Sequence, residues 1–121
     1  MFLSFFDGGD ERLQFQAKVS AGVKTTTRRR WDASFKAKVK ARLGYWFKAC
    51  THGRDPYNTC FGWIRIDSLE QTTLQECKEE DLAAEGCAEL TLAEFRTLPC
   101  FKGVGLTDPL ELVHFTFHSF L

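Results

Sequence analysis

Apolar and polar residues alternate one by one in three separate segments of this chain, and this period of two constrains the possible folds more than any other sequence feature. The clearest segment, residues 35–43, places five apolar residues in alternation with Lys36, Lys38, Lys40 and Arg42. Because successive side chains of a β-strand point to opposite faces, a strand here would set an apolar face against a core and four cations on the other side. We therefore predict a strand over residues 35–43 with a basic outer face.

Other short patterns predict three further strands. Residues 45–47 and 61–66 are rich in aromatic or β-branched side chains, and a polar stretch, residues 51–59, separates them. Residues 113–118 alternate apolar with polar side chains, which predicts a C-terminal strand.

Two segments carry helix signals. Thr91 followed by Glu94 forms a capping-box pattern, in which each side chain accepts a hydrogen bond from the other residue's backbone N–H. Residues 78–85 are rich in Glu and Ala and stop at Gly86, a residue typical of helix C-termini. We predict a helix in each place.

Residues 13–21 carry conflicting signals. Their apolar residues alternate strictly, which favours a strand. Gln, Ala and Lys favour a helix, however, Val19 is the only β-branched residue, and Gly22 lies where a helix would end. We predict a helix.

Chain length and element content together predict the fold class. The 121 residues fit a single domain over 1–121, because neither half would bury enough apolar surface to fold alone. Short, mostly antiparallel strands with two or three flanking helices indicate an α+β domain built on a small β-barrel. Apolar runs of only a few residues exclude a transmembrane helix. Residues 1–6 lack a preceding basic region and end at Asp7, so we expect no signal peptide.

Charge is unevenly distributed along the chain although its formal total is zero. Residues 1–54 contain 12 basic and 4 acidic residues, a net charge of +8, whereas residues 55–121 contain 4 and 12, a net charge of −8. Such asymmetry indicates contact with nucleic acid or membrane. We expect a basic and an acidic face, with Glu85 as the one acidic residue inside the basic site.

The cysteines are odd in number and widely spaced, at positions 50, 60, 77, 87 and 100. No pair has the short spacing of a zinc half-site, and disulfide scaffolds are normally smaller and richer in cysteine. We predict reduced, mostly buried thiols in a cytoplasmic protein. His114 and His118 would share a strand face without a third ligand nearby, so we expect neither a metal site nor a cofactor.

Residues 22–31 are the segment best suited to hold a ligand, because three threonines lie between one lysine and three arginines that precede a tryptophan. Hydroxyls and cations hold phosphate or sugar oxygens, and a tryptophan can stack on a base. The candidate binding residues are Thr26, Arg28, Arg29, Arg30 and Trp31. A strand whose arginines are solvated or paired with the acidic half fits the pattern equally well.

A second basic surface favours nucleic acid. Lys36, Lys38 and Lys40 on the predicted strand would extend the arginine run into a stripe suited to a polyanion. Aromatic residues, Trp46 among them, interleave with these cations, which fits single-stranded or structured RNA better than a DNA duplex. No helix-turn-helix or zinc-finger pattern is present. We therefore expect RNA or a nucleoside as the partner and no membrane contact.

Several short motifs resemble a known family by their order and separation. They are Gly-Val-Lys-Thr-Thr-Thr-Arg-Arg at 22–29, Gly-Tyr-Trp-Phe at 44–47, Trp-Ile-Arg-Ile at 63–66, Glu-Glu-Asp-Leu-Ala-Ala-Glu-Gly at 79–86 and Leu-Ala-Glu-Phe at 92–95. Over roughly residues 2–117 the chain resembles the ASCH (ASC homology) domain of the PUA-like superfamily. The resemblance implies a PUA-like β-barrel with flanking helices, one of them over about residues 11–21.

The resemblance also implies RNA binding and, in some members, removal of the acetyl group from N4-acetylcytidine by a lysine, a threonine and a glutamate. The matching positions are Lys24, Thr27 and Glu85. Thr27 would attack the acetyl carbonyl, Lys24 with a lowered pKa would accept its proton, and Glu85 would exchange protons with the cytosine amine. In a strand Lys24 and Thr27 would face opposite sides, so this chemistry requires Lys24 to lie in the turn after Gly22.

Three functions stay open. The first is an RNA- or modified-nucleoside-binding domain with a basic cleft around Lys24, Thr27, Arg28 and Glu85. The second is an N4-acetylcytidine amidohydrolase. The third is a non-catalytic protein-interaction domain whose two halves pair only with each other, in which Glu85 fixes the barrel through an arginine.

Overall fold

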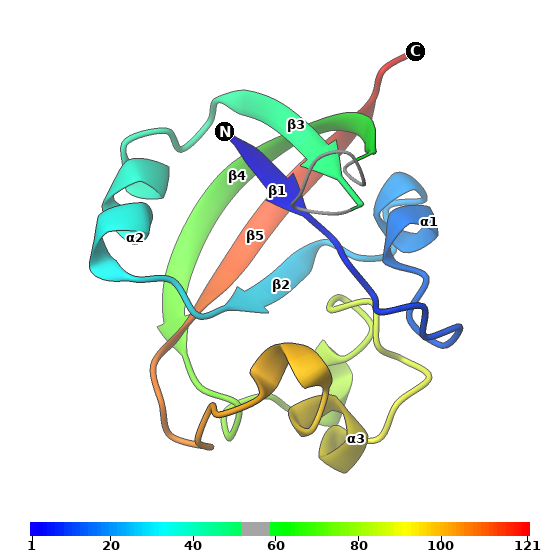
Figure 1. The fold of residues 1–121 in the computed structure, drawn as a ribbon, viewed down its shortest axis with the longest axis vertical. Coiled ribbons are helices and arrows are strands. Elements are labelled where there is room, and N and C mark those ends of the chain that lie inside the picture. Colours follow the sequence, from blue (N-terminus) through cyan, green and yellow to red (C-terminus); the bar gives the residue numbers. More distant parts are fainter. Residues whose placement is uncertain (52–58) are drawn as a thin grey trace.

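One five-stranded sheet forms the centre of the computed structural model, which describes residues 1–51 and 59–121 (Figure 1). Its strands are β1 (Phe2–Ser4), β2 (Thr26–Arg29), β3 (Trp46–Cys50), β4 (Cys60–Thr72) and β5 (Leu110–Ser119). They lie in the order β1-β3-β4-β5-β2, with β1 parallel to β3 and all other neighbours antiparallel. The predicted class, an α+β domain with mostly antiparallel strands, is confirmed, although in the described residues no strand pairing closes the sheet into the predicted barrel.

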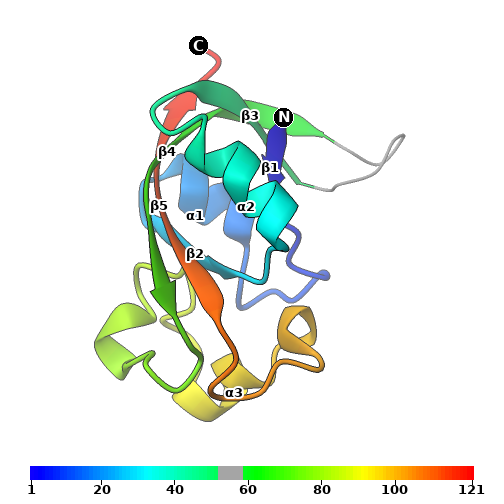
Figure 2. The same ribbon diagram turned by 90° about the vertical axis from the view of Figure 1, so that its left-hand side faces the viewer.

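The sheet is strongly curved, and its two edge strands approach each other. The long strand β4 bends along its length (Figure 1 and Figure 2), and its pairing with β5 shifts register between Ile66 and Ser68. Such an irregularity bends a strand. At the open side, Arg29 at the end of β2 donates a 2.5 Å hydrogen bond to the carbonyl of Ser4 at the end of β1. A side chain therefore links the two edges of the curled sheet.

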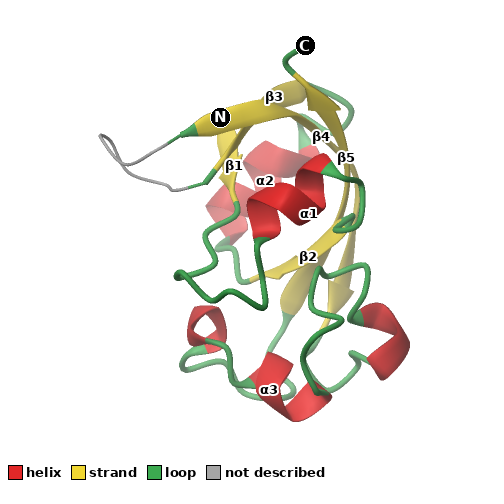
Figure 3. Ribbon diagram, turned by 90° about the vertical axis from the view of Figure 1, so that its right-hand side faces the viewer, coloured by secondary structure: helices red, strands yellow, loops and turns green. Residues whose placement is uncertain are grey.

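Two helices, α1 (Phe15–Ser20) and α2 (Ala33–Lys40), lie on the concave side of the curled sheet, one towards each of its ends (Figure 1 and Figure 3). Each contributes one fully buried valine to a hydrophobic core that we call the sheet cluster. Its buried members are Leu3, Phe5, Val19, Val39, Phe47, Ala49, Ile64, Ile66, Val113 and Phe115. The longest helix of the described residues, α2, has 8 residues, far fewer than the roughly 20 that cross a bilayer.

The strand predicted over residues 35–43 is wrong, because most of this segment forms helix α2. The carboxylate of Asp32 accepts a 2.7 Å hydrogen bond from the backbone N–H of Phe35, which caps the helix. Phe35 and Val39, four residues apart, share the helix face that packs on the sheet cluster. The other apolar residues of the helix are alanines, which are small and do not need burial. Their alternation with lysine therefore did not indicate a strand.

The remaining predicted elements are confirmed in type, except the helix predicted over residues 78–85. Strands β3, β4 and β5 and helix α1 form where the sequence predicts them. Helix α3 (Leu92–Arg96) begins at the capping box, with both Thr91–Glu94 hydrogen bonds present. Residues 78–85 form only a 3-10 helix, η1 (Glu79–Asp81), and further turns, which end at Gly86 with a φ of 77°.

The long connection between β4 and β5 builds a second core. It contains η1, α3 and a 3-10 helix, η2 (Pro99–Phe101), and it packs below the sheet in Figure 1. The buried members of this lower cluster are Leu13, Leu74, Cys77, Leu82, Cys87, Leu90, Phe95, Leu98, Phe101 and Leu110. Phe15 packs against both clusters and so lies at their junction.

Cys50 at the end of β3 and Cys60 at the start of β4 form a disulfide. The prediction of five reduced thiols is therefore wrong for this pair, which the β3–β4 hairpin places opposite each other although ten positions separate them. Cys77, Cys87 and Cys100 are free. Most of the predicted polar excursion, residues 52–58, lies outside the described residues. The cytoplasmic location stays a prediction.

Candidate functional site

A cavity of about 340 Å³ lies between the sheet cluster and the lower cluster, next to the point where the sheet edges meet. This volume falls within the range of about 300–1,000 Å³ that is usual for ligand pockets. Seven of the sequence-predicted site residues line it: Lys24, Thr27, Arg28, Arg29, Arg30, Trp31 and Glu85. Its apolar wall includes Phe5, Phe15, Phe95, Leu98 and Phe101.

Lys24 lies in the turn before β2, as the catalytic hypothesis requires. Its side chain is 3% exposed, and the Nζ donates hydrogen bonds to the carbonyls of Thr26 at 2.8 Å and Glu85 at 2.6 Å. The ammonium also lies 4.6 Å from the ring centroid of Phe15. Burial lowers the pKa of Lys24 to about 8, although the Glu85 carboxylate acts in the opposite direction. Lys24 therefore changes its charge state near physiological pH.

The turn around Gly86 makes room for Lys24. The carbonyl of Ala84 accepts hydrogen bonds from the backbone N–H groups of Thr25 and Thr26, which docks this turn on the start of β2. Gly86 has a φ of 77°, and a Cβ there would lie 3.1 Å from Cδ of Lys24. Glycine is thus required both by the backbone conformation and by the close approach.

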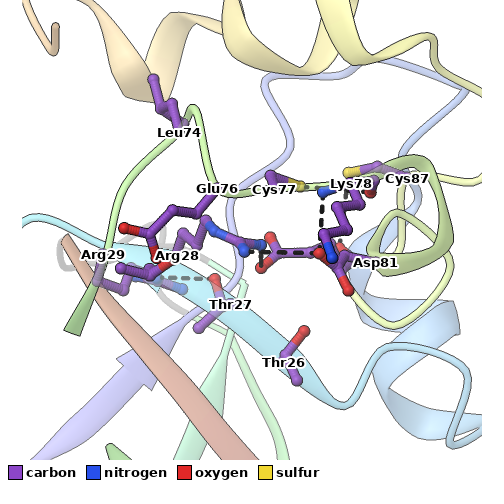
Figure 4. Close-up of polar contacts among 12 residues, drawn as sticks. Thr26, Thr27, Arg28, Arg29, Leu74, Glu76, Cys77, Lys78, Asp81 and Cys87 are labelled. Atoms are coloured by element: carbon purple, nitrogen blue, oxygen red, sulfur yellow. Dashed lines mark hydrogen bonds and ion pairs between the residues drawn. The ribbon is translucent and has the colours of Figure 1, made fainter. Parts of the chain in front are cut away.

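Arg28 and Glu85 form a buried ion pair, with Nη1 donating to Oε1 at 2.9 Å and both side chains 3% exposed. Figure 4 shows the Arg28 side chain extending from β2 towards Asp81, whose carboxylate lies 3.9 Å from Nη2. The Nε of Arg28 is buried and has no hydrogen-bond partner in the described parts of the chain. This geometry matches the alternative in which Glu85 fixes the fold by pairing with an arginine.

Arg29 positions the hydroxyl of Thr27. Its Nε donates to Oγ1 of Thr27 at 3.1 Å, while its other end binds the Ser4 carbonyl. The guanidinium carbon lies 5.6 Å from the ring centroid of Phe5. Burial lowers the pKa of Arg29 below its ordinary value. A hydroxyl and a cation are therefore held side by side on one wall of the cavity.

The cavity continues into a second hollow of about 460 Å³ that reaches the start of α2. The two share Ser4, Arg29, Arg30 and Trp31. Arg30 is exposed and donates a 3.4 Å hydrogen bond to the Gly103 carbonyl. Trp31 meets Phe35 edge to face, with their ring centroids 5.1 Å apart. A ligand larger than one base therefore has room on this side.

Four predicted binding residues lie elsewhere. Lys36, Lys38 and Lys40 are on α2 and Trp46 is on β3, and none of them lines the cavity. Lys36 pairs with Glu111 at 2.7 Å, whereas Lys38 and Lys40 are exposed, with no acidic partner in residues 1–51 and 59–121. The basic stripe predicted to border the cleft is therefore absent, because the segment is helical. Thr26 is buried and takes part through its carbonyl.

No protein-family model matches the sequence, and no curated protein matches it. Solved structures of similar fold include a DUF984 protein from Enterococcus faecalis, at 18% identity and a TM-score of 0.62, covering 98% of this chain and 76% of that one. An ASCH domain from Lactobacillus crispatus matches at 16% identity and a TM-score of 0.57, covering 98% and 79%. A mutant of the ZmASCH protein from Zymomonas mobilis matches at 16% identity and a TM-score of 0.52, covering 98% and 68%. The chain has an ASCH-like fold. The recognition made from its motifs is confirmed at the level of architecture.

The ASCH-like domain also brings together residues that the motifs did not identify. Phe15, Cys87 and Cys100 line the cavity, and Gly86 shapes it. The spacing of Phe15 and Val19, four residues apart on α1, was a sign of its inward position. No sequence signal distinguishes the thiols of Cys87 and Cys100. They line the cavity because of the way the β4–β5 connection folds.

Ion pairs join the two oppositely charged halves of this ASCH-like domain. Lys18 pairs with Glu89 at 2.6 Å and Arg12 with Glu94 at 2.6 Å, in addition to Arg28–Glu85 and Lys36–Glu111. These cations do not lie on a separate basic face, contrary to our expectation. The described cations of the first half are therefore divided between those that pair with acids and those without an acidic partner, which lie around the cavity, on and after α2, and on β3.

Proposed function

We propose that this ASCH-like domain binds a modified pyrimidine nucleoside, free or within RNA, in the cavity between its two hydrophobic clusters. The observation that supports this most directly is the cavity itself, in which a buried lysine, a hydroxyl and an arginine face aromatic rings. A flat base is recognised by aromatic faces and by hydrogen bonds to its edges. Phe15 and Trp31 supply the aromatic faces, and Lys24, Thr27 and Arg29 supply the hydrogen bonds.

The hydrogen-bonding capacity of the site suits a ligand rich in carbonyl oxygens. Lys24 has three N–H donors and uses two of them on described residues. The third, together with the Thr27 hydroxyl, is suited to the carbonyl of an N4-acyl group or of the pyrimidine ring. Arg29 and Arg30, which border the second hollow, are placed for a phosphate if the nucleoside is part of RNA.

Calorimetric titration with N4-acetylcytidine, cytidine and uridine tests this proposal. We expect saturable binding of N4-acetylcytidine that Thr27→Val weakens about fivefold or more, since a lost neutral hydrogen bond is worth about 1 kcal/mol. Thr25→Val is the matched control, because Thr25 is exposed and does not line the cavity. Absence of binding to all three nucleosides, or equal effects of the two variants, would refute the proposal.

A second candidate is hydrolysis of the N4-acetyl group, favoured by the lowered pKa of Lys24, which lines the cavity together with Thr27. The Thr27 oxygen would bond to the acetyl carbon while neutral Lys24 takes the hydroxyl proton, and Arg29 would stabilise the oxyanion. The carbon–N4 bond would then break, with the proton passing from Lys24 to N4. Water would hydrolyse the acetyl-threonine ester, which releases acetate and restores Thr27.

This route changes the role assigned to Glu85. Because its carboxylate binds Arg28, we assign the leaving-group proton to Lys24 and a structural role to Glu85. Neutral Lys24 keeps two N–H donors for its two carbonyl partners, and its lone pair must meet the Thr27 hydroxyl during the reaction.

Incubation with N4-acetylcytidine followed by chromatography for cytidine tests hydrolysis. The rate should rise as the pH passes about 8, where Lys24 becomes neutral, and Lys24→Ala should abolish it. If the wild-type protein binds N4-acetylcytidine without releasing cytidine, the hydrolysis proposal is refuted and the binding proposal is retained.

A further inference from the structure

The outer face of the sheet, away from the cavity, carries exposed aromatic side chains. Trp46 on β3 is 44% exposed and Trp63 on β4 is 38% exposed. Together with His118 and Phe120 they line a hollow of about 490 Å³. We call these four residues the outer aromatic face. Large exposed apolar patches on a small domain mark interaction surfaces more often than chance.

The strand register sets the rings of this face side by side. Trp46 is opposite Arg65, Lys48 is opposite Trp63, and Trp63 is opposite His118. Trp46 and Trp63 are therefore diagonal neighbours on one face of adjacent strands, about 7–8 Å apart. The guanidinium carbon of Arg65 lies 5.0 Å from the ring centroid of Trp46, and His118 meets Trp46 edge to face at 6.1 Å.

Cations lie next to the rings or shortly before them in the chain. Lys48 borders a further hollow that shares Trp46 and Trp63 with the first. The chain leaves α2 through Lys40 and Arg42 and passes the 64% exposed Tyr45 to enter β3 at Trp46. Lys40, Arg42 and Lys48 have no acidic partner within the described ranges, and Asp67, two residues after Arg65 on β4, pairs with Arg65. The charge of this surface favours a polyanion over an uncharged apolar partner.

We propose that the outer aromatic face is a second binding site, which takes single-stranded RNA by stacking bases on Trp46 and Trp63 while Lys48 and Arg42 contact phosphates. Stacking platforms of exposed aromatic rings flanked by cations are the common means of holding single strands. The choice of RNA over DNA rests on the proposed function of the cavity. The site itself rests on the rings and charges of the sheet.

Fluorescence anisotropy with a labelled decauridine tests the second site. We expect Trp46→Ala and Trp63→Ala each to weaken binding about tenfold, as removal of a stacking ring does. Leu106→Ala is the control, because Leu106 is 52% exposed in the loop before β5 and should leave binding unchanged. Lys48→Ala should reduce the slope of log K against log salt by about 0.7, and Lys102→Ala should not.

The two sites can be told apart with crossed variants. Lys24→Met should weaken N4-acetylcytidine binding and spare decauridine, whereas the double variant Trp46→Ala/Trp63→Ala should do the reverse. If the wild-type protein binds decauridine but no nucleoside, the cavity proposal is refuted and the proposal of the second site is retained. Thermal unfolding of the double variant checks that it is folded.

Three results would overturn the second site. The first is no binding of decauridine, or binding that the tryptophan variants do not change. The second is equal or tighter binding of decathymidine, which would refute the choice of RNA. The third is a wild-type dimer in analytical ultracentrifugation that the double variant converts to a monomer, since the face would then bind a second copy of this chain.

Discussion

The ammonium group of Lys24 donates a 2.6 Å hydrogen bond to the main-chain carbonyl of Glu85, while the carboxylate of Glu85 binds Arg28. The two charged groups that a catalytic interpretation of the motifs brings together thus belong to separate networks. Lys24 is held by neutral carbonyl dipoles, and it is desolvation by burial that lowers the pKa of its ammonium group.

Stability should increase with pH between about 8 and 10.5 because of Lys24. Its pKa is about 8 in the folded protein and 10.5 when exposed, so in this interval the unfolded chain binds the extra proton. Below pH 8 both states are protonated and Lys24 gives no pH dependence. The gain over the whole interval is about 3 kcal/mol. Urea unfolding at a series of pH values measures it.

Lys24→Met serves as the reference for that measurement. Cysteines and other groups titrate in both proteins, so the difference between the two pH profiles isolates Lys24. Parallel profiles would show that the pKa of Lys24 is the same in the folded and the unfolded protein, which would contradict its burial in the structure.

Removal of Glu85 should destabilise the protein strongly, because Arg28 would be left as a buried, nearly unpaired charge. We expect Glu85→Ala to lower the free energy of unfolding by about 3–5 kcal/mol. Replacement of both partners, Arg28→Met with Glu85→Leu, should recover much of this loss, since no unpaired charge remains. Chemical denaturation of the single and double variants measures both. A double variant less stable than Glu85→Ala would contradict this explanation.

Gly86→Ala should reduce stability and nucleoside binding together. The positive φ costs a non-glycine residue about 1–2 kcal/mol, and the new methyl group would press on the Lys24 side chain at 3.1 Å. Gly103→Ala is the matched control, with a φ of 79° and no neighbour within 4 Å of its Cβ. Both variants should unfold at lower temperature than wild type, but only Gly86→Ala should weaken the calorimetric titration with N4-acetylcytidine.

Cys100 should be the one free thiol that a maleimide labels in the folded, disulfide-bonded protein. Cys77 and Cys87 are buried, whereas Cys100 is exposed and borders the cavity. Desolvation raises the pKa of the Cys100 thiol, so labelling should accelerate as the pH increases. Bound N4-acetylcytidine should slow it. Mass spectrometry counts the labels, and Cys100→Ser should take none; unaltered labelling at saturating nucleoside would place the ligand outside the cavity.

Local sequence signals predicted most elements of the fold. The capping box at Thr91, the glycine at 86 and the alternation over β5 each act within a few residues, so tertiary packing was not needed to interpret them. The alternation over residues 35–43 failed for a physical reason. Alanine is tolerated on either face of a helix or strand, and the spacing of Phe35 and Val39 fits a helix as soon as Asp32 caps it.

The sequence by itself indicated which residues of the 22–29 motif are candidates for a site, and that a catalytic role for Lys24 requires it to precede the strand. Only the tertiary structure decided their partners. Lys24 meets Glu85 across 61 positions and Arg28 meets Glu85 across 57, because the β4–β5 connection folds back onto β2. The tertiary structure also decided that Trp46 lies on the outer face of the sheet, away from the cavity. Such distant contacts depend on how the curled sheet and its two hydrophobic clusters pack, which no short window of sequence records.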